Sequence, residues 1–174
     1  MRKIVRLLLA VALMTLGGCS VNESAFDHAP EAQFTNTVSS GPEVTIVEPR
    51  AVDFTYFKDG KSQTQTVNGE VHVSVKDVLD AQTGVHFYNV WIHDPVPDKV
   101  TVLYTSVKGS FDEKDYTEIP EFYGVSFSYD SEHGNCMFAC QNGYTYKIIA
   151  EWDKKNYREN GYYGTAEYYI YFEE

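Results

Sequence analysis

From residue 43 onward apolar side chains recur at every second position, and this period of two constrains the fold more than any other feature of the sequence. Val71, Val73 and Val75, for example, alternate with the polar residues His72 and Ser74. Such alternation is typical of a half-buried β-strand. Strand-like segments follow one another at 54–57, 63–67, 70–75, 85–93, 100–104, 125–129, 136–140, 144–152 and 164–172. The segment 85–93 is apolar on both faces, which predicts a central strand, and the one helical candidate is the short stretch 76–82.

Three dipeptides that favour tight turns lie between neighbouring strand segments: Asp59-Gly60, Asn68-Gly69 and Asn142-Gly143. Residues of these types tolerate the positive φ angles of hairpin turns. Each dipeptide therefore predicts a hairpin between the strands that flank it. Short strands at roughly 8–12-residue spacing predict one all-β domain over residues 43–174, either a sandwich or a barrel.

The C-terminal third resembles a known class of sandwich. Segment 144–152, entered through Asn142-Gly143, resembles the penultimate strand of immunoglobulin-like and fibronectin-type domains, and 164–172 fits their last strand. The resemblance implies that Tyr144 or Tyr146 hydrogen-bonds back to the backbone, although the paired inter-sheet cysteines of antibody domains are missing. We therefore expect an immunoglobulin-like β-sandwich of antiparallel strands, with a lipocalin-like or other β-barrel as the alternative.

The N-terminus has the pattern of a secretory signal peptide. Arg2, Lys3 and Arg6 precede a run from Leu7 to Leu16 that is apolar apart from one threonine. A short apolar run after a basic start is how such signals read, and a bilayer-spanning helix would need roughly 20 apolar residues. Residues 1–18 are therefore predicted to direct export and then be removed.

The end of this segment, Leu16-Gly17-Gly18-Cys19, resembles the lipobox of bacterial lipoproteins. The resemblance implies cleavage before Cys19, a lipid on that cysteine, and a location outside the cytoplasmic membrane, with Ser20 permitting delivery to the outer membrane of a didermal bacterium. An ordinary secreted protein is the alternative. Residues 19–42 are polar and contain Pro30 and Pro42, so we expect a flexible tether with Phe26 and Phe34 outside the core.

Charge limits the partners of the exported chain. Removing residues 1–18 leaves 14 − 3 = 11 Lys and Arg against 25 Asp and Glu, a formal charge of −14. Such a surface repels nucleic acid phosphates. The expected partners are the membrane, through the lipid on Cys19, and a protein or an envelope glycan.

Cys136 and Cys140 leave two alternatives open. If they share one strand, the rise of about 3.3 Å per residue sets them too far apart to bridge, and both stay as buried thiols on one face. If they lie in a turn or a bulged end, the exported location permits a disulfide.

The sequence carries no motif for a nucleophile, a phosphate loop or a zinc helix. His72 and His86 could meet across neighbouring strands around a metal, but ordinary strand histidines explain them as well. The acidic loop residues near 94–98, 112–115 and 130–132 are expected to be solvated charge. No enzyme activity, no cofactor and no metal is therefore predicted.

Tyrosines crowd the C-terminus. Tyr162 and Tyr163 lie between two glycines and are expected in an exposed loop, and one of Tyr168 and Tyr169 is expected to face solvent. Exposed aromatic rings can stack on sugar rings, so Tyr157, Tyr162 and Tyr163 are the candidate ligand-binding residues. The predicted function is a lipid-anchored binding or structural module of the cell envelope. The alternatives are a small extracytoplasmic hydrolase using Asp or Glu and an inhibitor or immunity-type lipoprotein.

Overall fold

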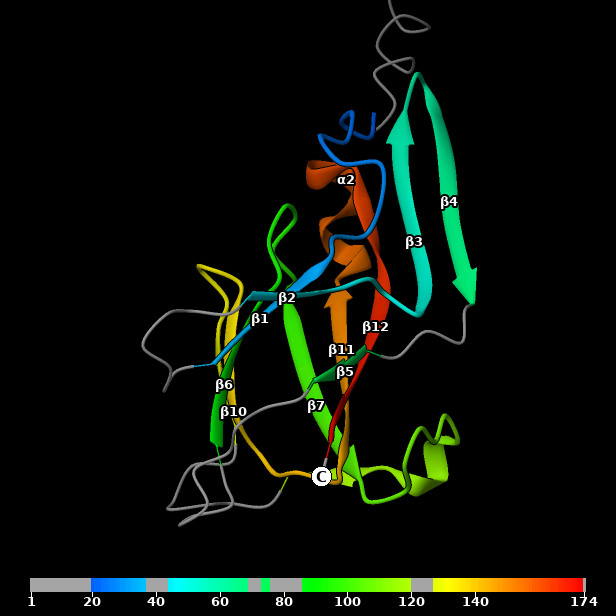
Figure 1. Cartoon of the computed structure of the whole chain (residues 1–174). Coiled ribbons are helices and arrows are strands. Elements are labelled where there is room, and N and C mark those ends of the chain that lie inside the picture. Colours follow the sequence, from blue (N-terminus) through cyan, green and yellow to red (C-terminus); the bar gives the residue numbers. More distant parts are fainter. Residues whose placement is uncertain (1–19, 37–43, 69–72, 76–85, 120–126, 174) are drawn as a thin grey trace, which may run out of the picture.

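The protein is an all-β sandwich of two sheets (Figure 1), as the sequence predicts. The computed structural model describes residues 20–36, 44–68, 73–75, 86–119 and 127–173. Within these residues each sheet ends in edge strands, so the two sheets do not close into the barrel of the alternative prediction.

The first sheet has the strand order β2-β1-β6-β10-β9, with every neighbouring pair antiparallel. Its strands are β1 (Ala32–Asn36), β2 (Val44–Val47), β6 (His86–Trp91), β9 (Phe127–Asp130) and β10 (Asn135–Cys140). Strand β6 lies in the middle, between β1 and β10. The predicted central strand is thereby confirmed.

The second sheet has the order β4-β3-β12-β11-β7-β8, and β5 pairs in parallel with the end of β12. Its strands are β3 (Ala51–Lys58), β4 (Lys61–Asn68), β5 (Val73–Val75), β7 (Lys99–Thr105), β8 (Thr117–Glu118), β11 (Thr145–Trp152) and β12 (Tyr162–Phe172). Three short helical turns complete the described structure: η1 (Glu113–Asp115), η2 (Lys154–Asn156) and α2 (Tyr157–Asn160). The predicted helix at 76–82 lies outside the described residues.

The core lies between the sheets and is rich in aromatic side chains. Alternate residues of β11 and β12 point into it, because successive side chains on a strand face opposite sides. The largest fully buried aromatic side chains of this core are Phe34, Phe54, Phe138, Tyr146, Tyr168 and Phe172. Buried tyrosine hydroxyls need partners. The Tyr168 hydroxyl donates to the Pro30 carbonyl oxygen (2.7 Å) and the Tyr146 hydroxyl accepts from the Gln141 N–H (2.8 Å).

The turn predictions have different outcomes. Asp59 and Gly60 have φ angles of 53° and 72° and join β3 to β4 in the predicted hairpin. Gly69 lies outside the described residues. The hairpin predicted at Asn142-Gly143 is wrong, because β10 belongs to the first sheet and β11 to the second. That turn carries the chain from one sheet to the other.

The prediction of a flexible tether over residues 19–42 is wrong for the described residues 20–36. Strand β1 pairs with both β2 and β6, and Phe34 is completely buried. Phe26 packs edge-on against Tyr162, with ring centroids 5.7 Å apart. Strand β1 forms because apolar and polar residues alternate over 32–35, and its apolar residues Ala32 and Phe34 face the core. The domain therefore includes residues that precede its predicted start at 43.

Candidate functional site

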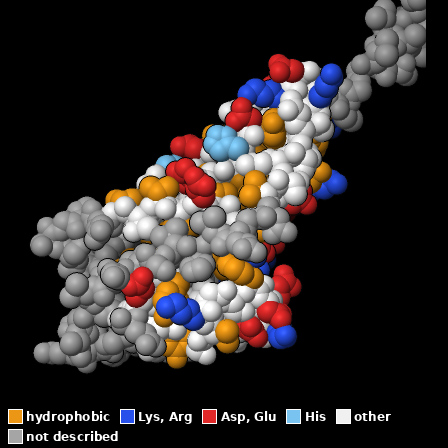
Figure 2. All heavy atoms as spheres, turned by 45° about the vertical axis from the view of Figure 1, so that its right-hand side comes forward, with side chains coloured by type: hydrophobic (Ala, Val, Ile, Leu, Met, Phe, Trp, Pro, Cys, Tyr) orange, Lys and Arg blue, Asp and Glu red, His pale blue; other side chains and the backbone are white. Residues whose placement is uncertain are grey.

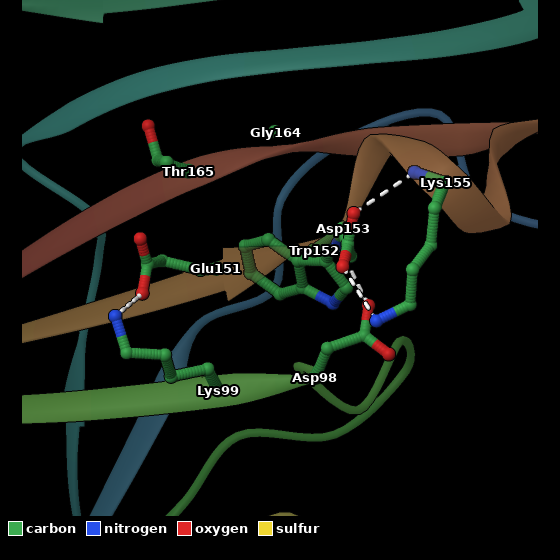
Figure 3. Close-up of a pocket in the computed structure, with 8 residues that line it drawn as sticks. All are labelled: Asp98, Lys99, Glu151, Trp152, Asp153, Lys155, Gly164 and Thr165. Carbon is green, nitrogen blue, oxygen red and sulfur yellow. Dashed lines mark hydrogen bonds and ion pairs between the residues drawn. The ribbon is translucent and has the colours of Figure 1, made fainter.

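The outer face of the second sheet is hollowed in two adjoining places. One hollow, of about 490 Å³, lies on the side of η2 and α2 and is called the upper hollow (Figure 3). The other, of about 330 Å³, is lined in part by Phe111 and Glu113 of the loop that carries η1 and is called the lower hollow. Thr165, an exposed residue of β12, lines both. The two hollows together are called the outer groove.

The upper hollow is lined by paired charges. Lys99 of β7 contacts Glu151 of the neighbouring strand β11, and Lys155 contacts Asp153 (2.6 Å). Figure 3 shows these two pairs on opposite sides of Trp152. The hydrogen bond from Lys155 holds the pKa of Asp153 below its usual range, so this carboxylate is ionised at neutral pH.

Two further residues shape the upper hollow. The Trp152 indole is almost fully buried and donates to the Pro95 carbonyl oxygen (3.2 Å), so it forms a floor and not an exposed platform. Gly164 has a φ of 148°, and a Cβ there would lie 2.1 Å from the Asp53 carbonyl oxygen. Only glycine therefore lets β12 approach β3 this closely.

The lower hollow contains a buried lysine. The Lys147 side chain is 4% exposed, and its ammonium lies 2.8 Å from a carboxylate oxygen of Glu167. Glu113, which is 87% exposed, lies farther from the same ammonium, at 3.8 Å. The Tyr169 hydroxyl donates to Glu167 (2.8 Å). Burial raises the pKa of Tyr169, so this hydroxyl stays protonated at neutral pH.

An arginine also lines the lower hollow. The Arg50 guanidinium carbon lies 3.5 Å from the centre of the Phe111 ring and 4.9 Å from that of Tyr169. This is the geometry of a cation–π contact. Its Nε atom is buried and has no hydrogen-bond partner in the described part of the chain. Both hollows thus offer charged hydrogen-bonding groups beside aromatic side chains.

The loop between β7 and β8 accounts for one wrong prediction. It places Phe111 and Tyr116 edge-on against Tyr169. Tyr169 is therefore 1% exposed, although it lies on the opposite face of β12 from buried Tyr168. The expectation that one of the two faces solvent is wrong, because the loop covers the outward one.

The three candidate tyrosines do not lie together. Tyr162 and Tyr163 belong to β12 and not to a loop, so they point to opposite faces. Tyr162 stacks on Phe54 (5.8 Å), on the core side. Tyr163 packs edge-on against Tyr157 (4.9 Å) and lies two residues before Thr165 on the outer face. Tyr157 and Tyr163 therefore remain candidates beside the upper hollow, and Tyr162 does not.

Cys136 and Cys140 are buried thiols on strand β10 and form no disulfide, which is the first of the two alternatives. Burial raises the pKa of Cys136 to about 12. A protonated, enclosed thiol reacts slowly. These cysteines therefore belong to the core and not to a reactive site.

The acidic loop residues mostly hold the backbone. Asp112 caps η1 and Asp130 accepts from the N–H groups of Glu132 and His133. Asp98 accepts from the Asp153 N–H and from the Asn156 side-chain amide. The His72–His86 idea lies outside the described side chains. Among the side chains described, no three His, Cys, Asp or Glu residues converge as a metal site would require.

The sequence did not single out Arg50 and Lys147. Lys147 stands at an outward position of an otherwise apolar run, Tyr146 to Ala150, and this is the one signal for it. Lys147 is buried because the loop with Phe111 and Glu113 covers it. The alternation of residues in β11 gives no indication of that contact.

No family model, no curated protein and no solved structure matches this chain. Within the described residues, none of the helices has the length and apolar character needed to cross a bilayer.

Proposed function

We propose that this protein is a lipid-anchored binding module of the bacterial cell envelope, and that its outer groove takes an envelope glycan. The single observation that carries the proposal is the pair of adjoining hollows on one sheet face, joined at Thr165. Export and lipid on Cys19 rest on the signal pattern at residues 1–19. Within the sandwich class we propose an immunoglobulin-like domain, supported by the hydrogen bond between Tyr146 and the backbone of Gln141.

The lining of the groove suits a sugar chain. Carboxylates such as Glu151 accept hydrogen bonds from hydroxyl groups, and cations such as Lys99 and Lys147 donate them. The apolar CH faces of sugar rings pack on aromatic rings, which Tyr163 offers at one end and Phe111 at the other. A ligand lying across Thr165 would touch both hollows.

Recognition fits these groups better than catalysis does. A hydrolase needs a carboxyl group free to transfer a proton to the substrate. Glu151 is paired with Lys99, and Glu167 with Lys147 and the Tyr169 hydroxyl. These interactions fix the side chains in place, which favours binding.

We predict that Thr165→Arg abolishes glycan binding, because the long side chain enters both hollows from an exposed position without disturbing the core. The measurement is retention of residues 19–174, carrying Cys19→Ser, on insoluble cell-wall and polysaccharide preparations. Tyr163→Ala is expected to weaken retention.

Ser128→Arg is the matched control, since Ser128 is an exposed strand hydroxyl on the first sheet. It should bind like the parent. An equal loss of retention in both arginine variants, or no loss in either, would contradict the outer groove as the glycan-binding site. No retention of the parent on any preparation would contradict the glycan ligand and point to a protein partner.

We also predict that Cys19→Ser in the full-length chain abolishes stable membrane attachment, because two or more acyl chains are what make lipid anchoring stable. The measurement is fractionation of cells followed by a salt wash. A variant that stays in the washed membranes would contradict lipidation at Cys19.

A further inference from the structure

The first described residues are fastened to one end of the sandwich. The Asn22 N–H donates to the Arg158 carbonyl oxygen (3.1 Å), and its side-chain amide donates to that of Glu159 (3.0 Å). The Ser24 N–H donates to the Phe57 carbonyl oxygen (2.8 Å). The chain is therefore held against α2 and the end of β3.

Glu23 strengthens this attachment. Its carboxylate accepts from the backbone N–H groups of Asp59 (3.0 Å) and Gly60 (3.2 Å), in the turn between β3 and β4. The approach is also close at Gly161, where a Cβ would lie 2.4 Å from the Asn22 carbonyl oxygen. We call residues 20–28, 57–62 and 153–161 the anchored end. Figure 1 shows the start of the described chain beside α2 and the β3–β4 hairpin.

Asn22 lies three positions after Cys19 in the sequence, and extended chain spans at most about 3.5 Å per residue. A lipid on Cys19 therefore keeps Asn22 within about 10 Å of the bilayer surface. We propose that the anchored end lies against the bilayer and holds the domain in one orientation, with the upper hollow nearer the membrane and the lower hollow farther away. This inference rests on the lipid anchor of the proposed function.

Charge supports this orientation independently. The anchored end carries five bases and five acids, a net charge of 5 − 5 = 0. The bases are Lys58, Lys61, Lys154, Lys155 and Arg158, and the acids are Glu23, Asp27, Asp59, Asp153 and Glu159. The rest of the chain after residue 18 carries 11 − 5 = 6 bases and 25 − 5 = 20 acids, a net charge of −14.

Figure 2 shows red and blue side chains intermixed at the upper end of the molecule. Anionic lipids repel acidic surfaces and attract basic ones over about a Debye length. The end nearest the lipidated cysteine is thus a surface that such lipids do not repel, unlike the strongly acidic remainder.

Native lysines can test the orientation without introduced labels. We expect acylation of Lys58, Lys61 and Lys155 by an amine-reactive ester to slow several-fold in membranes, compared with residues 19–174 carrying Cys19→Ser in solution. Lys108 and Lys114 lie in the loop between β7 and β8, at the opposite end of the domain. They should react at equal rates in the membrane-bound and the soluble protein. The rates are read by mass spectrometry of peptides. In the free domain the side chains of Lys155 and Lys114 are similarly exposed, at 73% and 77%.

The control is a lipidated variant with a flexible Gly-Ser linker inserted between Ser20 and Val21, which should restore fast labelling of Lys58, Lys61 and Lys155. Unchanged labelling in a native protein that stays in washed membranes would overturn the orientation and leave the anchor standing. A native protein that washes off would overturn the anchor, and the orientation with it.

Discussion

A chain that starts at residue 43 is expected to remain unfolded, whereas one that starts at residue 20 folds. Strand β1 lies between β2 and β6, so its removal takes hydrogen-bond partners from both strands. It also removes the buried side chains of Ala32 and Phe34 and the carbonyl group of Pro30 that pairs with buried Tyr168. Losing one buried Phe side chain costs about 3–5 kcal/mol, and the whole stability of a domain is about 5–15 kcal/mol. Circular dichroism and thermal melting of the two chains measure the difference.

Point variants separate the contribution of the core from that of chain length. Phe34→Ala in the chain from residue 20 should lose about 3–5 kcal/mol of unfolding free energy. Phe26→Ala should lose less, because Phe26 packs on half-buried Tyr162 at the edge of the core. A cooperative transition of residues 43–174 at the same temperature as the longer chain would contradict the structural role of β1.

Replacing Lys147 with methionine is expected to lower the unfolding free energy by about 3 kcal/mol, the lower end of the range for breaking a buried ion pair. The lower end applies because the partner Glu167 keeps 23% of its side chain exposed and so regains some hydration. The cost arises from leaving that carboxylate without its ammonium in the lower hollow. Urea unfolding of the variant and the parent measures it.

Lys99→Met provides the control on the same sheet face. Lys99 and Glu151 form a pair with side chains 67% and 38% exposed, and such surface pairs contribute about 0–1 kcal/mol. The double variant Lys147→Met with Glu167→Gln should lose less than the two single changes added together, because the interaction is removed only once. Equal, small losses in Lys147→Met and Lys99→Met would contradict a buried ion pair.

The parts of the fold that the sequence predicts well are those that local chemistry determines. The hairpin at Asp59-Gly60 follows from two residues that tolerate positive φ, flanked by alternating strands. At Asn142-Gly143 the same signal reports the turn but not the sheet to which the next strand goes. The sheet that a strand joins is determined by residues far away in the sequence. The sequence does not predict strand β1, because its alternation covers only a few residues in a polar region.

In the candidate site, too, the sequence predicts the features that depend on neighbouring residues and not those that depend on distant ones. The sequence predicts Tyr157 and Tyr163 as candidates, and the ring of Tyr157 in α2 packs against that of Tyr163 in β12. The prediction for Tyr162 is wrong because its flanking glycines indicate a loop, whereas β12 begins at that residue and Tyr162 packs on the core side. Arg50 and Lys147 form a site only when the loop with Phe111 folds over the sheet, and no local pattern reports that contact.

The proposed function and the orientation of the domain both depend on the chemistry of Cys19, so mass spectrometry of the N-terminal peptide from membrane-extracted protein tests the account most directly. The predicted result is a chain that begins at Cys19 and carries a diacylglyceryl group on its sulfur. A chain cleaved at another position, or an unmodified Cys19 at the N-terminus, would contradict it.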